Sequence, residues 1–328
     1  MHLLLIAVTI LMGAAVGWSI GANDAANSLG AAVGSKVLTL RRAIILITIF
    51  GFLGAFLQGG QVTKTIGKGI VPMDQLGKDL SLYLALVACF AACAWVVLAT
   101  YWKMPISTSH SIVGAVAGAG LAMGAPIKWK VLTDIFICWF LTPLGAALLG
   151  FIFYQLFKNS LYRIIPRKFL RPGLAALIVI SGCYVAFTWG ANDVANSVGV
   201  ISGAGILTPN ISIVIGGAAI VLGIVTWGYK VIETVGSEIT QLLPIMAFSA
   251  QLASAINVHI YTLFGIPVST SHSIVGAIFG VGLVRGVRVL NVRIIREIVF
   301  CWLATPFISG IISFLVLKTI MIFVKIGG

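Results

Sequence analysis

A polar decapeptide occurs twice in this chain, at residues 21–30 and 190–199, and eight of its ten positions are identical. Its centre reads Asn-Asp-x-x-Asn-Ser, and helical spacing places Asp24, Asn27 and Ser28 on one face. Carboxylate, amide and hydroxyl oxygens favour a hard cation such as Na⁺, and a carboxylate can also carry a proton. An Asp that only caps a helix is the plainer interpretation, but it leaves the duplicated asparagines unexplained. The expected ion-handling residues are Asn23, Asp24, Asn27, Asn192, Asp193 and Asn196.

A second decapeptide, rich in hydroxyl groups, occurs at residues 105–114 and 267–276 with nine of ten positions identical. It opens with Pro-x-Ser-Thr-Ser, and Pro, Ser and Thr are typical of helix starts. A helix that begins inside a membrane exposes backbone N–H groups, and these favour an anion together with the hydroxyls and the positive end of the helix dipole. Two such starts could hold one anion between them. The residues expected to bind it are Thr108, Ser109, Thr270 and Ser271.

Each copy of the hydroxyl-rich motif also contains a histidine, His110 or His272. A neutral imidazole that braces the turn through a backbone carbonyl is one interpretation. Direct contact with a ligand, or proton coupling, is the other. A third echo pairs Cys138-Trp139 with Cys301-Trp302 at a similar offset, and the pattern assigns no chemistry to it.

None of the four motif copies contains a lysine or an arginine. An anion held by neutral donors beside Asp24 and Asp193 would leave negative charge uncompensated in a low dielectric. Cations bound together with the anion would compensate that charge, and obligatory joint binding amounts to symport. Ser, His and Asp also occur in hydrolases, but a hydrolase needs one nucleophile and not a symmetric pair. The motifs therefore indicate a transporter and not an enzyme, and they require no cofactor beyond the coupling ion.

The elements that position these motifs must be membrane helices. The chain has 328 residues, of which 60% are hydrophobic and 9% charged, and its mean hydropathy is +1.12. A soluble fold cannot cover that much apolar surface. Residues 3–20 lack a preceding basic segment, so they are expected to form the first span and not a signal peptide. The net charge of +13 lies in short loops, which favours a positive-inside topology over nucleic-acid binding. Ten apolar stretches are expected at 3–20, 43–60, 80–102, 105–123, 131–157, 173–189, 210–228, 241–264, 267–284 and 297–324.

The duplicated motifs divide the chain into two repeats, residues 1–157 and 173–328, joined by a basic cytoplasmic linker at 158–172. Equivalent loops of the two repeats differ in their basic content, as expected when two halves insert upside down relative to each other. The predicted fold is therefore an all-α polytopic membrane protein. It consists of two inverted-topology repeats with broken or re-entrant helices and about 10–12 membrane segments.

At these motifs the chain resembles the inorganic phosphate transporter family of PiT-type permeases. The paired sequences G-A-N-D-[AV]-A-N-S and P-[IV]-S-T-S-H-S are close to the family's signature, and the resemblance covers essentially the whole chain. It implies sodium- or proton-coupled import of inorganic phosphate by alternating access, and a homodimer. It also implies that Asp24 and Asp193 handle both ion and substrate, and that Ser107 and Ser269 take part in coordination.

One local departure from symmetry places Lys64 opposite Glu233, so Glu233 stays a candidate for ion coupling in one repeat only. The short linker fits a compact prokaryotic permease of the inner membrane. Three alternatives stay open: a permease for sulfate or another oxyanion, proton in place of sodium coupling, and a passive anion channel.

Overall fold

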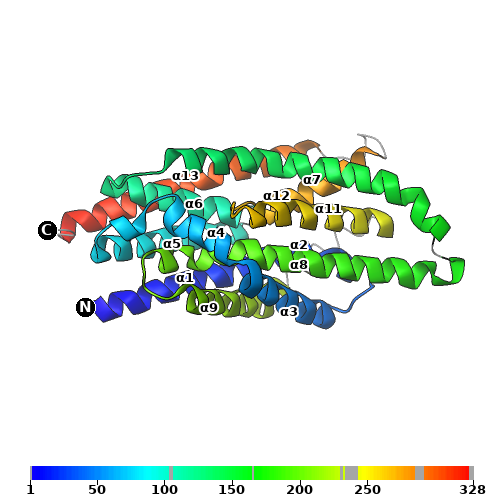
Figure 1. The fold of residues 1–328 in the computed structure, drawn as a ribbon, viewed down its shortest axis with the longest axis horizontal. Helices are drawn as coiled ribbons and strands as arrows, with labels where there is room; N and C mark the ends of the chain where they lie inside the picture. The colour runs from blue at the N-terminus through cyan, green and yellow to red at the C-terminus, as the bar shows by residue number, and fades with distance from the viewer. Residues whose placement is uncertain are drawn as a thin grey trace.

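The computed structural model describes residues 2–102, 106–164, 166–229, 232, 243–284 and 292–324, and they form helices joined by short connections. The long helices run approximately along the long axis of the molecule (Figure 1). Within these residues, seven helical segments are long and apolar enough to cross a membrane. The predicted all-α membrane fold is confirmed.

The helices fall into two similar series. The first series comprises α1 (His2–Asp24), α2 (Ala26–Gly34), α3 (Leu40–Gln58), α4 (Gly60–Lys64), the π-helix η1 (Thr65–Gly69), the 3-10 helix η2 (Met73–Gln75), α5 (Lys78–Tyr101), α6 (Thr108–Met123) and α7 (Trp129–Ile164). The second comprises the 3-10 helix η3 (Arg167–Phe169), α8 (Leu170–Gly203), α9 (Pro209–Gly223), the π-helix η4 (Ile224–Gly228), α11 (Pro244–Leu263), α12 (Thr270–Leu283) and α13 (Val292–Phe323).

Each series contains a helical hairpin that turns back inside the molecule. Helices α5 and α6 lie in the half of the long axis nearer the two termini, and α11 and α12 lie in the other half (Figure 1). The two hairpins enter from opposite ends, so the second series is inverted relative to the first. These hairpins are the re-entrant elements that the hydroxyl-rich motifs predict.

The two series are interleaved, and equivalent helices of the two series make equivalent contacts. Helix α6 packs on α13 of the other series, and its counterpart α12 packs on α7. Likewise α1 contacts α9, while α8 contacts α3. Each series therefore stabilises the other, and the main buried cluster contains residues of both.

Glycines allow the hairpin helices to approach their neighbours closely. A Cβ atom on Gly114 of α6 would collide with the backbone of Pro306 in α13, and one on Gly276 of α12 would collide with Pro143 in α7. Small residues at such crossings are typical of membrane helix pairs, where close backbone approach supplies the packing energy. The starts of α6 and α12 are thus held firmly against the two long helices.

Two features differ in detail from the sequence-based expectation. The apolar stretches 3–20 and 173–189 are expected to end just before the two copies of the first decapeptide, yet α8 is continuous through residues 190–199. In the other copy only Ala25 separates α1 from α2, with helical torsions of −56° and −32°. The helices persist because the aspartates and most asparagines of the motif bond to other helices and do not compete for their own backbone. Ser197 does bond its own helix, at the carbonyl oxygen of Val194, without interrupting α8. The basic stretch 158–172 is mostly helical, since α7 extends to Ile164 and α8 begins at Leu170. Residues Pro105 and Glu233 lie outside the described part of the chain.

Candidate functional site

The carboxylate of Asp24 is buried where α1 ends, between the tips of both hairpins. Its Oδ2 accepts a hydrogen bond from Thr108 Oγ1 at 3.1 Å, and its Oδ1 accepts one from Ser271 Oγ at 3.0 Å. Asn27 donates from Nδ2 to the same Ser271 oxygen at 2.8 Å. One carboxylate thus contacts a hydroxyl from the hairpin of each repeat.

The carboxylate of Asp193, in the middle of α8, has the equivalent surroundings. Its Oδ2 accepts from Thr270 Oγ1 at 3.1 Å, and its Oδ1 accepts from Ser109 Oγ at 3.2 Å and from Asn196 Nδ2 at 3.0 Å. Asn196 Nδ2 also lies 3.0 Å from Ser109 Oγ, while Asn196 Oδ1 is buried and has no hydrogen-bond partner among the described residues. Ser109 also contacts the carbonyl oxygen of Val268, at 2.8 Å.

These contacts form one constellation with two-fold pseudosymmetry. In each half, the Thr of one hairpin and the second Ser of the opposite hairpin share a carboxylate, so each of the four predicted anion-binding residues bonds to one of the two aspartates. The constellation consists of Asp24, Asn27, Thr108 and Ser271 in one half, and Asp193, Asn196, Thr270 and Ser109 in the other.

Asn23 and Asn192 are directed away from the aspartates. Asn23 Nδ2 donates to Thr100 Oγ1 at 2.7 Å, and Asn192 Nδ2 donates to Thr262 Oγ1 at 2.9 Å. Asn192 Oδ1 also accepts from the backbone N–H of Val268, at 3.1 Å. Both asparagines therefore fasten a hairpin to the motif helix. The two threonines stand 162 positions apart, the same offset as the hydroxyl-rich motif, so the repeat itself contains the signal for them.

Ser107 and Ser269 cap the hairpin helices. The Ser107 hydroxyl oxygen accepts a hydrogen bond from the backbone N–H of His110, and the Ser269 hydroxyl oxygen accepts one from the backbone N–H of His272. The distance is 3.2 Å in both cases. These bonds satisfy one orphan N–H at each helix start, as an N-cap serine does. Both histidines are buried. His110 Nδ1 lies 3.2 Å from the carbonyl oxygen of Trp302, which agrees with the bracing interpretation.

No basic side chain pairs with either aspartate among the described residues. The ion pairs found there join His2 to Asp79 at 3.5 Å and Lys68 to Asp74 at 3.8 Å, and all four of these side chains are more than 40% exposed. Two buried carboxylates surrounded only by hydroxyl and amide groups form an environment that a cation stabilises.

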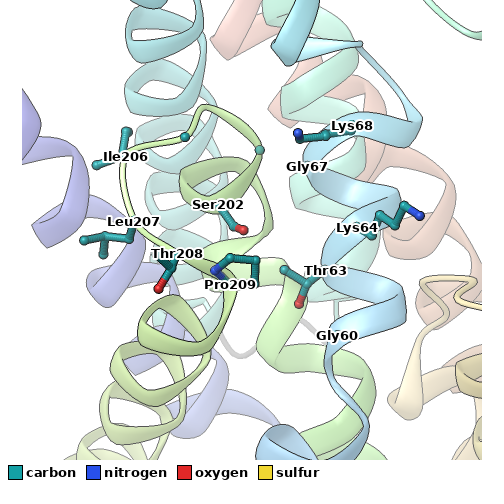
Figure 2. Close-up of a pocket in the computed structure, with 12 residues that line it drawn as sticks. Gly60, Thr63, Lys64, Gly67, Lys68, Ser202, Ile206, Leu207, Thr208 and Pro209 are labelled. Atoms are coloured by element: carbon teal, nitrogen blue, oxygen red, sulfur yellow. The ribbon is translucent and has the colours of Figure 1, made fainter.

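A separate cavity of about 620 Å³ lies between α4–η1 and the connection from α8 to α9. Figure 2 shows the amine of Lys68 directed toward that connection, whereas the amine of Lys64 turns the other way. None of the residues of the duplicated motifs lines this cavity. Lys64 is therefore exposed at a peripheral surface, away from the carboxylates.

Comparison with known proteins is consistent with this geometry over the whole chain. The profile of the phosphate transporter family matches twice, over residues 20–172 and 163–313. A protein of Pyrococcus furiosus that is named as a phosphate permease is 32% identical, with 96% of each chain covered. A chloroplastic inorganic phosphate transporter of Arabidopsis thaliana is 30% identical over 90% of this chain and 69% of its own.

A solved structure described as the sodium-dependent phosphate transporter superimposes with a TM-score of 0.91. It is 28% identical and covers 98% of this chain and 100% of its own. Two inverted hairpins that meet at paired aspartates, two profile matches and a relative aligned over 96% of this chain all lead to one conclusion. The chain belongs to the phosphate transporter family.

Proposed function

We propose that this protein imports inorganic phosphate together with sodium ions by alternating access. The observation that carries the proposal is the pair of buried carboxylates, each hydrogen-bonded to hydroxyls from both hairpins, with no lysine or arginine paired to them in the described residues. A site of this composition needs a cation before it can hold an anion. The names of the relatives support phosphate as that anion, and the likeness to a sodium-dependent phosphate transporter supports sodium as that cation.

The cations are proposed to bind at the aspartates. Asp24 with Asn27, and Asp193 with Asn196, each supply a carboxylate and an amide oxygen, which are ligands suited to a hard cation. Asn196 Oδ1, buried without a partner, is available for such a bond. Asn23, Asn192, Ser107 and Ser269 are proposed to act by positioning, since their described bonds are directed to the hairpins.

The phosphate is proposed to bind between the starts of α6 and α12. Thr108 and Ser109 open one helix, and Thr270 and Ser271 stand at the start of the other. Hydroxyl groups, backbone N–H groups and the positive ends of two helix dipoles then all face the anion.

The hydrogen bonds suggest how the two ligands depend on each other. A Ser or Thr hydroxyl has a single hydrogen, and in this arrangement the carboxylates accept it from Thr108, Thr270 and Ser271. A cation on the carboxylates competes for the same lone pairs and releases the hydroxyls to donate to phosphate. Cation binding is therefore proposed to come first and to raise the affinity for phosphate.

We also propose a topology, a cellular location and an oligomeric state for the protein. The basic linker 158–172 is proposed to face the cytoplasm, following the positive-inside rule. The chain is proposed to lie in the inner membrane of a prokaryote and to work as a homodimer, with residues 1–157 and 173–328 as its two repeats. The relatives include archaeal and bacterial proteins that align over 96% of this chain.

Uptake of radiolabelled phosphate into proteoliposomes tests the proposal, with the membrane potential clamped at zero. An inward sodium gradient should accumulate phosphate above its external concentration, and a pH gradient alone should not. Accumulation driven only by the pH gradient would establish proton coupling instead. Equilibration without accumulation under either gradient would indicate a channel.

A further inference from the structure

A single glutamine of α11, Gln251, links that helix to two others. The residue is buried and lies outside both duplicated motifs. Its Nε2 donates to the carbonyl oxygen of Ser28 in α2 at 2.8 Å, and its Oε1 accepts from Ser181 Oγ in α8 at 2.8 Å. A buried amide is costly unless its polar atoms are bonded, so these two bonds hold the side chain where it lies.

The hairpin of the first series has no equivalent bridge among the described residues. Gln251 stands 162 positions after Cys89 of α5, the same offset that relates the two hydroxyl-rich motifs. Cys89 is fully buried, and no hydrogen bond joins it to a motif helix in the described part of the chain. The counterpart of Ser181 is Met12, which has no hydroxyl group. The glutamine bridge therefore departs from the two-fold pseudosymmetry of the site.

The bridge reaches the half of the site that is less firmly built. Asp193 and Asn196 lie in one unbroken helix, α8, and their side chains bond to each other at 3.0 Å. Asp24 is the last residue of α1, whereas Asn27 belongs to α2, and in the described residues no hydrogen bond joins these two side chains. The geometry of the Asp24 half thus depends on how α2 is held.

Helix α2 is held at two points by the α11–α12 hairpin. Asn27 donates to Ser271 Oγ at the start of α12, and the carbonyl oxygen of Ser28 accepts from Gln251 of α11. On its other side α2 lies against α8, where a Cβ atom on Gly182 would stand 3.0 Å from the Ser28 carbonyl oxygen. A movement of this hairpin therefore displaces α2 as long as both bonds hold.

We propose that Gln251 is a positioning residue that makes α2 move together with the α11–α12 hairpin and thereby controls the cation site at Asp24. This inference rests on the proposed function, in which the aspartates hold the coupling cations. When the hairpin is displaced, α2 moves Asn27 relative to Asp24, and the cation ligands of that half separate. Asp193 and Asn196 keep their spacing within α8. The two cation sites are thus inequivalent, and the affinity of the site at Asp24 follows the position of the hairpin.

Hydrogen–deuterium exchange on the full-length protein in lipid nanodiscs without phosphate tests this role, in choline and in sodium. Gln251→Met removes both bonds with a side chain of similar size. Gln251→Asn keeps the position polar but is one methylene too short to reach both partners, and it serves if the Met variant does not fold. Ser249→Ala is the matched control, because it also removes a buried polar group of α11, but one that bonds to its own helix at Ile245.

In choline, the amides of α2 should exchange about tenfold faster in either Gln251 variant than in the wild type, because the bond from Gln251 to α2 is lost. Those of residues 190–199 in α8 should be unchanged. In sodium, the wild-type protein should show protection of both segments. The Gln251 variants should lose most of the protection of α2 and keep that of residues 190–199, and Ser249→Ala should match the wild type throughout.

Two results would overturn the proposal. Unchanged exchange of α2 in both Gln251 variants would show that the glutamine does not hold this helix. Equal loss of sodium protection in the two segments would show that Gln251 only stabilises the fold, since a general loosening acts on both halves alike. The proposed function fails separately if sodium protects neither segment of the wild-type protein, and the comparison in choline then still decides whether Gln251 holds α2.

Discussion

At the scale of residues, the site consists of two buried carboxylates that accept hydrogen bonds from Ser and Thr hydroxyls. No basic side chain pairs with them in the described part of the site. Asp24 and Asp193 each accept hydrogen bonds from both hairpins, so each carboxylate links two hairpin helices. A cation that alters the charge of either group must also alter the bonds that hold the hairpin starts. That dependence is the physical basis that we propose for coupling.

Removing one charge at a time tests this role of the carboxylates. Asp24→Asn and Asp193→Asn each keep one oxygen that accepts a hydroxyl bond, and the new amide N–H₂ can donate to the oxygen of the other hydroxyl. Folding should therefore be preserved while cation binding is lost. Sodium-driven phosphate uptake in proteoliposomes should fall at least a hundredfold in each variant. Asp134→Asn is a suitable control, because Asp134 is an exposed acid that contacts neither hairpin tip. Wild-type sodium dependence in either site variant would refute the assignment.

We propose that selectivity for phosphate also depends on the two aspartates. Phosphate keeps a hydroxyl at neutral pH and can donate to a carboxylate, whereas sulfate can only accept. An acceptor buried against another acceptor costs about 1–3 kcal/mol, or roughly 5- to 150-fold in affinity. Excess arsenate, which keeps a hydroxyl, should therefore inhibit uptake strongly and sulfate weakly. If sulfate competes as well as arsenate does, the aspartates do not accept a hydrogen bond from the hydroxyl of the anion. An oxyanion permease of broader specificity is then the better description.

At the scale of elements, the hairpins are positioned by backbone contact as much as by side chains. Gly114 and Gly276 let α6 and α12 lie against the proline-containing segments of α13 and α7. The caps Ser107 and Ser269 then determine where each hairpin helix begins. Because the packing glycines and the N-cap serines occur in both hairpins, a substitution that displaces either hairpin should affect the shared site in the same way.

Substitution of a packing glycine tests this positioning. Gly114→Val would drive α6 away from the backbone of Pro306, where no flexible side chain can yield. Overpacking of this kind costs roughly 1–3 kcal/mol or more, so the melting temperature of the purified protein should fall by several degrees and phosphate binding should weaken. Gly77→Val is the matched control, since a Cβ there meets nothing within 4 Å. An unchanged melting temperature in Gly114→Val would show that the hairpin is not packed as described.

Much at this scale can be predicted from the sequence because the motifs occur twice. The duplicated Asn-Asp and Ser-Thr-Ser segments are enough to indicate a shared constellation. Which hydroxyl meets which aspartate cannot be predicted, because the pairing of Ser271 with Asp24 depends on how two inverted hairpins interdigitate. The partner of Asn192, Thr262, is a lone hydroxyl in an apolar helix, and only its place 162 positions after Thr100, the partner of Asn23, distinguishes it in the sequence. Trp139 and Trp302 can be recognised in the sequence as a repeated Cys-Trp pair. That their rings stack on His110 and His272 is evident only from the structure.

At the scale of the whole molecule, two interleaved repeats of opposite orientation build one site at their common centre. Each repeat supplies a motif helix and a hairpin, yet every half-site takes residues from both repeats, so neither repeat could bind its ligands alone. An inverted pair of this kind is suited to alternating access, because the two ends of the molecule are built from equivalent parts. In the proposed mechanism, ion and anion bind where both hairpins contribute residues.

The most direct measurement is the dissociation constant for phosphate, determined by calorimetry on the purified protein in sodium and in choline at equal ionic strength. If sodium on the carboxylates releases the site hydroxyls, phosphate should bind at least tenfold more tightly in sodium, a coupling of about 1.4 kcal/mol or more. In Asp24→Asn that difference should largely disappear. Equal affinities for phosphate in sodium and choline, in a wild-type protein that binds phosphate well, would contradict the coupling of cation and anion through the two aspartates.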